Sequence, residues 1–151
     1  MSLITMLKPE LVLAKQNIVS KKRVLENIAS AVSNRLHCDG SAIYSGLLAR
    51  EKLGSTGIGE GIAIPHCRLE SANNAAILVM SLESPIDFDS IDRKPIDLIF
   101  ALIVPPSECD AHLETLAQIA QLAQSPNGLN ALREAQTNDS LFAAFEKLLQ
   151  G

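Results

Sequence analysis

The chain has 151 residues, a length that suits one domain with one sizeable core. Hydrophobic residues make up 47%, charged residues 20%, and the formal net charge is −4, so we expect a stably folded protein. Aromatic residues are only 3%, and no basic stripe is interleaved with them, which argues against a nucleic-acid-binding protein. We therefore predict a single domain over residues 1–151 with an aliphatic core.

Membrane insertion and secretion find no support in the sequence. The longest apolar run, residues 98–104, is far too short to span a bilayer, and polar residues and a proline at 8–10 interrupt any signal-peptide core. Three cysteines, Cys38, Cys67 and Cys109, form no C-x-x-C pair. An odd number of unpaired cysteines favours free thiols in a reducing compartment, so we predict a cytoplasmic protein.

The pattern of apolar residues predicts alternating helices and strands. In chain order we expect a strand at 11–14, helices at 20–36 and 41–53, strands at 61–64, 76–82 and 96–104, and helices at 107–123, 127–135 and 139–149. Ser20 and Ser41 are the expected N-caps of the first two helices, Gly54 ends the second, and Ser107-x-x-Asp110 resembles a capping box. Nearly continuous aliphatic strands between helices favour an α/β fold, a three-layer α/β/α arrangement around a mixed sheet.

A glycine-rich segment is the most informative part of the chain. Residues 54–68 read GSTGIGEGIAIPHCR, with Arg50 just upstream. Exposed backbone N–H groups at glycines can wrap an anion, and a histidine beside such a site can accept a phosphoryl group. The segment is not a Walker A loop, because no Gly-Lys-Ser/Thr follows, and it is not a dinucleotide fingerprint, because Ile62 occupies the third glycine position. Read separately, the glycines could form a plain turn, and His66 could be an ordinary polar residue.

The same segment resembles a known signature. Residues 50–59, REKLGSTGIG, followed by 61–66, GIAIPH, resemble the bacterial phosphotransferase-system enzyme IIA domains of the fructose/mannitol type. Residues 20–26, SKKRVLE, are similar to the nitrogen-regulatory branch of that family, enzyme IIA-Ntr. The resemblance covers about Leu3 to Leu149 and implies a small mixed β-sheet flanked by helices on both faces. It departs from many members at Cys67, where they carry glycine.

The resemblance also implies roles for three charged or titratable residues. His66 is expected to accept the phosphoryl group as a tele-phosphohistidine, while Arg50 and His112 stabilise that group without carrying it. From the residues alone, Arg50 could equally be a solvated charge at a helix end, and His112 a surface histidine. His37, in a turn-like stretch, is interpreted as a surface residue.

Phosphate binding is further expected from Ser55, Thr56, Gly57 and Gly59. The two hydroxyls are possible donors, and the glycines expose backbone N–H groups. The resemblance places this loop near the phosphate. Considered alone, the serine and threonine could merely serve the turn.

A zinc site is the competing interpretation of the histidines and cysteines. Cys109-x-x-His112 and His66-Cys67 together could supply four ligands. However, adjacent residues on a strand point to opposite sides, and zinc would leave the glycine-rich loop unexplained. We therefore predict no metal and no other cofactor.

These observations predict a phosphotransferase that acts as a phosphohistidine carrier. The chain contains no nucleotide-binding motif, so ATP is not the expected donor. The resemblance implies a donor of the HPr or NPr kind, and target proteins such as a transporter or a sensor kinase in nitrogen, potassium or carbon metabolism. One alternative is a sugar-uptake component that passes the phosphoryl group to a separate IIB protein. Another is a binding module whose histidine is never phosphorylated.

Overall fold

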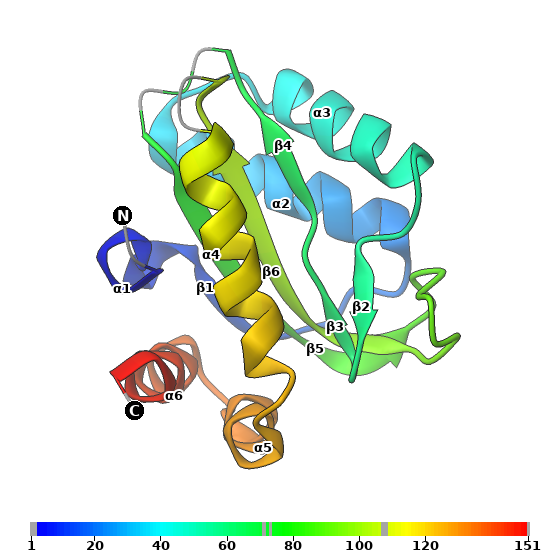
Figure 1. Ribbon diagram of the computed structural model, residues 1–151, viewed down its shortest axis with the longest axis vertical. Coiled ribbons are helices and arrows are strands. Elements are labelled where there is room, and N and C mark those ends of the chain that lie inside the picture. The colour runs from blue at the N-terminus through cyan, green and yellow to red at the C-terminus, as the bar shows by residue number, and fades with distance from the viewer. Residues whose placement is uncertain (1–2, 71, 73, 107–108, 151) are drawn as a thin grey trace.

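A mixed β-sheet forms the centre of the fold (Figure 1). The computed structural model describes residues 3–70, 72, 74–106 and 109–150. Within them lie six strands: β1 (Val12–Gln16), β2 (Gly57–Gly59), β3 (Ile62–Ala63), β4 (His66–Arg68), β5 (Ala76–Ile86) and β6 (Ile96–Val104). The order is β1-β5-β6-β3-β2, with β4 also paired to β6. The β5–β6 and β2–β3 pairs are antiparallel, and the other pairs are parallel.

Helices cover both faces of this sheet, which confirms the expected three-layer α/β/α fold. The helices are α1 (Leu3–Met6), a 3₁₀ helix (Pro9–Leu11), α2 (Lys21–Leu36), α3 (Gly40–Lys52), α4 (Cys109–Leu122), α5 (Pro126–Glu134) and α6 (Asn138–Gln150). Helices α2 and α3 pack on one face, while α4 crosses the other, which α1, α5 and α6 also cover (Figure 1). None of the described helices combines the length and apolar character that crossing a membrane requires.

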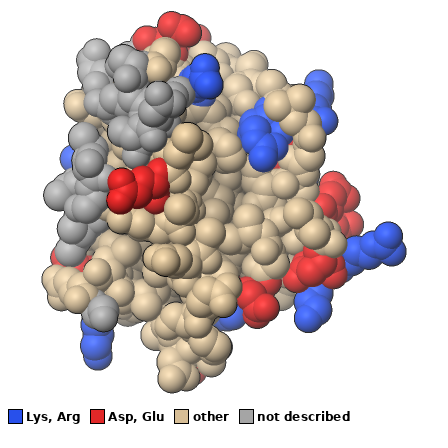
Figure 2. Space-filling view, viewed as in Figure 1, with Lys and Arg blue, Asp and Glu red and all other residues tan. Residues whose placement is uncertain are grey.

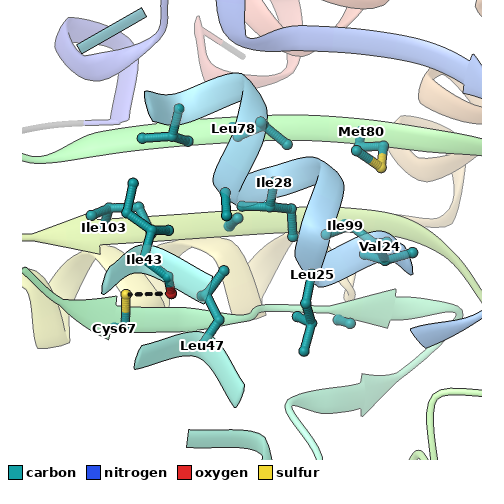
Figure 3. Packing of buried hydrophobic residues seen from close by; sticks show 14 of the residues in the cluster. Val24, Leu25, Ile28, Ile43, Leu47, Cys67, Leu78, Met80, Ile99 and Ile103 are labelled. Carbon is teal, nitrogen blue, oxygen red and sulfur yellow. Dashed lines mark hydrogen bonds between the residues drawn. The ribbon is translucent and has the colours of Figure 1, made fainter. Parts of the chain in front are cut away.

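The two long strands are apolar on both sides because both sides are buried. In β5, Leu78 and Met80 point to the core beneath α2 and α3, where they meet residues such as Ile28 (Figure 3). Ile77 and Val79 point to the opposite core, beneath the other helices. Side chains alternate along a strand, so a strand covered on both faces carries a continuous aliphatic run.

The capping predictions have mixed outcomes. Ser20 is the N-cap of α2, where its hydroxyl accepts from the backbone N–H of Arg23 at 3.2 Å, as expected. The prediction for Ser41 is wrong: α3 begins at Gly40, and the carboxylate of Asp39 accepts from the N–H of Ser41 at 2.9 Å. A carboxylate at that position is as good an N-cap as a hydroxyl, and it takes the first orphan N–H groups.

The capping box expected at the start of α4 stays a prediction. Ser107 and the side chain of Asp110 lie outside the part of the chain that the structure describes.

A break in one strand determines where His66 lies. The predicted strand at 61–64 is shorter than expected, and after Ile64 and Pro65 the chain pairs with β6 again as β4. At the break, the N–H of Ile64 donates to the carbonyl of Thr56 at 3.0 Å, and the carbonyl of Pro65 accepts from Leu102 at 2.9 Å. His66 therefore begins a new strand, with its backbone held firmly on both sides.

Candidate functional site

The hydrogen bonding of His66 distinguishes its two ring nitrogens. Its Nδ1 lies 2.8 Å from the carbonyl oxygen of Ile64, two residues earlier in the chain. A carbonyl oxygen can only accept, so Nδ1 must carry the proton, and the lone pair of the neutral ring is then on Nε2. The half-buried ring is thus fixed in one tautomer with Nε2 as its nucleophilic atom.

His66 lines a cleft of about 410 Å³ that brings together distant parts of the chain. The lining residues are Arg50, Ser55, Thr56, Gly57, Ile58, Ile64, His66, Ile91, Leu116, Ala117 and Ala120. The structure thus gathers five of the seven predicted site residues around one space. Gly59 ends β2 with φ of +100°, outside this lining. A larger cleft of about 750 Å³ near α4, α5 and α6 contains none of the predicted residues.

Arg50 lies in the last turn of α3, half-buried at the wall of the cleft. Its Nη1 donates to the carbonyl oxygen of Gly54 at 2.9 Å. This bond orients the guanidinium group at the helix end, and a guanidinium has five N–H donors in all. Arg50 can therefore hold its own loop and present donors to an anion at the same time.

His112 is a buried residue of α4, with 3% of its surface exposed, which excludes the surface-histidine interpretation. Its Nδ1 lies 3.3 Å from the hydroxyl oxygen of Thr115. Leu116 and Ala120 follow at four-residue intervals and line the cleft, so all three residues share one face of the helix. His37, by contrast, is exposed at the C-cap of α2, as predicted.

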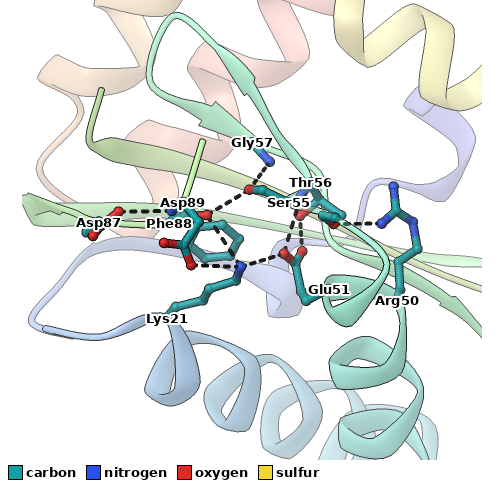
Figure 4. Close-up of polar contacts among 10 residues, drawn as sticks. Lys21, Arg50, Glu51, Ser55, Thr56, Gly57, Asp87, Phe88 and Asp89 are labelled. Carbon is teal, nitrogen blue, oxygen red and sulfur yellow. Dashed lines mark hydrogen bonds and ion pairs between the residues drawn. The ribbon is translucent and has the colours of Figure 1, made fainter. Parts of the chain in front are cut away.

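The hydroxyls of Ser55 and Thr56 both have partners within the protein. Ser55 donates to the carbonyl oxygen of Phe88 at 2.7 Å and accepts from the N–H of Gly57 at 3.0 Å (Figure 4). The hydroxyl of Thr56 donates to the carboxylate of Glu51, and its N–H reaches the same carboxylate at 3.3 Å. In this arrangement the two hydroxyls hold the loop in shape.

Two charged residues beside the cleft have no place in the sequence-based account. Glu51 is only 7% exposed and forms an ion pair with Lys21, at 2.8 Å between Oε2 and Nζ. The sequence spacing could have revealed this buried carboxylate, because Glu51 follows Ile43 and Leu47 at four-residue intervals on the buried stripe of α3. A carboxylate on an apolar stripe indicates a buried charge that needs a partner.

In the described part of the chain, two large exposed apolar side chains line the cleft. Ile91 and Ile58 both line it; Ile91 is 84% exposed, and Ile58, in β2, is 40% exposed. Leu53, just after α3, and Leu113 on α4 are also exposed. Figure 2 shows few charged side chains over the middle of this face and more along its edges. Large apolar side chains that gather around a polar site are typical of protein-binding surfaces.

The chain is similar to several proteins described as nitrogen regulatory proteins. The chain is 48% identical over 124 residues to the nitrogen regulatory protein of Pseudomonas aeruginosa, which covers 82% of this chain and 80% of that protein. It is 40% identical over 143 residues to the nitrogen regulatory protein of Escherichia coli K12, with 94% and 88% covered. The crystal structure of nitrogen regulatory protein IIA-Ntr from Neisseria meningitidis superimposes with a TM-score of 0.87 at 30% identity, over 93% of this chain and 97% of that one.

The family model described as "Phosphoenolpyruvate-dependent sugar phosphotransferase system, EIIA 2" matches residues 5–148. That span contains the whole sheet, the glycine-rich loop and both candidate histidines of the site. The chain therefore belongs to the EIIA type 2 family of the phosphoenolpyruvate-dependent sugar phosphotransferase system.

Proposed function

We propose that this protein is a phosphocarrier in which Nε2 of His66 accepts a phosphoryl group from a phosphoprotein of the HPr or NPr kind. The observation that carries the proposal is the bond from Nδ1–H to the carbonyl of Ile64, which leaves the Nε2 lone pair available in a ring that lines the cleft. The family match supports a role in phosphoryl transfer, and the similarity to nitrogen regulatory proteins supports a regulatory output.

The transfer balances without an additional reactant. The lone pair on Nε2 attacks the phosphorus of the donor's phosphoimidazolium, and the P–N bond of the donor breaks. The donor's ring leaves as neutral imidazole with the electron pair of that bond. His66 becomes the phosphoimidazolium, and its Nδ1–H continues to donate to the carbonyl of Ile64. That bond favours the cationic product, because a carbonyl oxygen stabilises a positively charged donor.

The surrounding groups are suited to the charge that develops on the phosphoryl oxygens. Arg50 brings a permanent positive charge to the wall of the cleft. Gly57, which lines the cleft and whose N–H is bonded to Ser55, and Gly59, at the end of β2, are assigned to the phosphate-binding loop. We assign His112 to phosphate stabilisation from α4, one turn before the cleft-lining Leu116. Ser55 and Thr56 belong to the same phosphate-binding loop, to which their hydroxyls give a fixed shape.

The donor is a protein, because the cleft lies within an apolar surface. Ile58 and Ile91 line the cleft and are exposed, so a docking protein would cover them while its phosphohistidine reaches His66. The exchange is assigned to the cytoplasm, since Cys38 and Cys67 are free thiols, which persist in reducing compartments.

Phosphorylation would then change what the protein binds. A phosphohistidine adds up to about two negative charges at the centre of this surface. A target that docks through apolar side chains would prefer the unphosphorylated form, and one that docks through lysine or arginine the phosphorylated form. Regulation of nitrogen, potassium or carbon metabolism through a transporter or a sensor kinase fits such a switch.

Pull-downs from native cytosol with phosphorylated and unphosphorylated protein test this output. We expect the two forms to retain different proteins, with the partners of His66→Ala matching those of the unphosphorylated form. Identical partner sets, together with transfer of the phosphoryl group to a separate IIB protein, would contradict regulation and favour the sugar-uptake alternative.

A further inference from the structure

Glu51 is a buried carboxylate to which the proposed chemistry assigns no role. It occupies the last turn of α3, directly after Arg50, and accepts both the hydroxyl and the N–H of Thr56. Removing a carboxylate from water is costly unless it is paired and hydrogen-bonded. The burial of Glu51 therefore depends on these hydrogen bonds and on a positively charged partner, not on the hydrophobic effect.

The partner of Glu51 comes from a different helix. Lys21 is the first residue of α2, and its Nζ lies 2.8 Å from Glu51 and 3.6 Å from Asp89 (Figure 4). The same ammonium donates to the carbonyl of Phe88 at 3.4 Å and lies 4.9 Å from the centre of its ring. A positive charge in the first turn is unfavourable for a helix itself, so the position of Lys21 reflects these tertiary contacts.

The contacts of Lys21 join two loops that form walls of the cleft. The carbonyl of Phe88 accepts from both Lys21 and the hydroxyl of Ser55, so one oxygen connects the lysine with the glycine-rich loop. Gly57 lies directly against Ser90, and a Cβ added at Gly57 would stand 2.8 Å from the Ser90 hydroxyl oxygen. The loop at 54–58 and the loop at 87–91 are thus locked together over the ion pair.

From these contacts we infer that Lys21 and Glu51 form a positioning pair for the phosphoryl-transfer site. Glu51 fixes Thr56 and with it the loop that faces His66, while Lys21 neutralises Glu51 and anchors the loop at 87–91. Neither side chain lines the cleft or touches a reacting atom. A site whose donors are held in advance needs no rearrangement during transfer. This inference rests on the proposed function.

The test measures the rate of phosphoryl transfer to His66 in the double variant K21M/E51M and in the wild-type protein, with each of two donors. One donor is a phosphorylated phosphocarrier protein of the HPr kind, and the other is phosphoramidate, a small molecule that phosphorylates imidazoles without docking. Removing both charges together avoids an unpaired buried ion, so we expect the double variant to retain a cooperative thermal transition. We expect transfer to His66 to be slower by about 10- to 100-fold with both donors, because the loop loses its anchor.

Three further variants separate positioning from general destabilisation. K21R retains the positive charge and should keep most of the wild-type transfer rate. R23M/E26M is the matched control, since it removes an exposed ion pair, at 3.9 Å, from the same first turns of α2, and it should transfer at the wild-type rate. Thr56→Val, which keeps the side-chain shape and removes the hydroxyl bond to Glu51, gives a second test if the double variant does not fold.

The outcomes distinguish this inference from the function on which it rests. A wild-type protein that gains no phosphoryl group from either donor would overturn the proposed function and the inference together. A reactive wild type with K21M/E51M and Thr56→Val at the same rate would overturn the inference alone. Slower transfer with the protein donor only would also overturn it, because the pair would then act on docking.

Discussion

His66 and Cys67 are neighbours in β4, but their side chains lie on opposite faces of the sheet. His66 faces the cleft beside α4, whereas Cys67 lies in the core beneath α2 and α3 (Figure 3). There its Sγ is 3.9 Å from the carbonyl oxygen of Ile43. The thiol is therefore separated from the proposed nucleophile, and the two side chains cannot approach one metal ion together.

Burial raises the pKa of Cys67 from its ordinary value of 9.0 to about 11. The folded protein then holds a proton that the unfolded chain releases, so stability from this thiol is present below about pH 9 and is lost as the pH rises towards 11. The loss is on the order of 2 kcal/mol. We expect the free energy of unfolding, measured in urea, to fall more steeply between pH 9 and 11 for wild type than for Cys67→Ala. Equal slopes would contradict the raised pKa of Cys67.

Gly57 is expected to tolerate no side chain. A Cβ there would meet the hydroxyl oxygen of Ser90 at 2.8 Å and its Cβ at 2.9 Å. Gly57→Ala should therefore lower the free energy of unfolding by about 1–3 kcal/mol, as overpacking does. Ser90→Gly removes both of these atoms, so Gly57→Ala/Ser90→Gly should recover part of the loss in thermal denaturation. A double variant less stable than Gly57→Ala would show that this contact is not the cause.

The architecture was largely predictable because its long elements carry strong patterns. The aliphatic runs of β5 and β6 follow from burial on both faces, and Ser20 identifies the start of α2. The short strands β2 and β4 were not predicted. Each has three residues and depends on pairing with a distant strand rather than on its own periodicity. For the same reason the extension of β5 to Ile86 was missed.

At the site, the linear motif identified His66 and the glycine-rich loop, because those residues are close in sequence. The directions of the Ser55 and Thr56 hydroxyls could not be predicted, since they depend on the distant Phe88 and on the buried Glu51. The partnership of Lys21 with Glu51 likewise requires α2 and α3 to be packed together.

Phosphoryl transfer to His66 should depend on the guanidinium group of Arg50 and not on its positive charge alone. Lysine at this position retains one positive charge but cannot both hold the carbonyl of Gly54 and present a planar pair of donors. We expect Arg50→Lys to slow transfer to His66 by about 10- to 100-fold in rapid-quench measurements. Arg35→Lys, on the exposed end of α2, is the control. Wild-type kinetics in Arg50→Lys would make Arg50 an ordinary helix-end charge.

The proposed acceptor predicts which ring nitrogen of His66 would carry the phosphoryl group. With Nδ1–H bonded to the carbonyl of Ile64, only Nε2 has a lone pair, so the adduct should be the tele isomer. Couplings between ring protons and labelled ring nitrogens in NMR spectra distinguish the two isomers. Acid treatment should return the unmodified spectrum, because a phosphoramidate is acid-labile. A phosphoryl group on Nδ1 would require the bond to Ile64 to break and would contradict the proposed tautomer.

The most direct test of the account is the intact mass of the protein after incubation with a phosphorylated phosphocarrier of the HPr kind. Wild type should gain the mass of one phosphoryl group, and so should His37→Ala, whose histidine is exposed at the end of α2. His66→Ala should gain nothing while retaining the wild-type circular dichroism spectrum. A His66→Ala protein that still takes up the phosphoryl group would contradict the assignment of His66 as the acceptor.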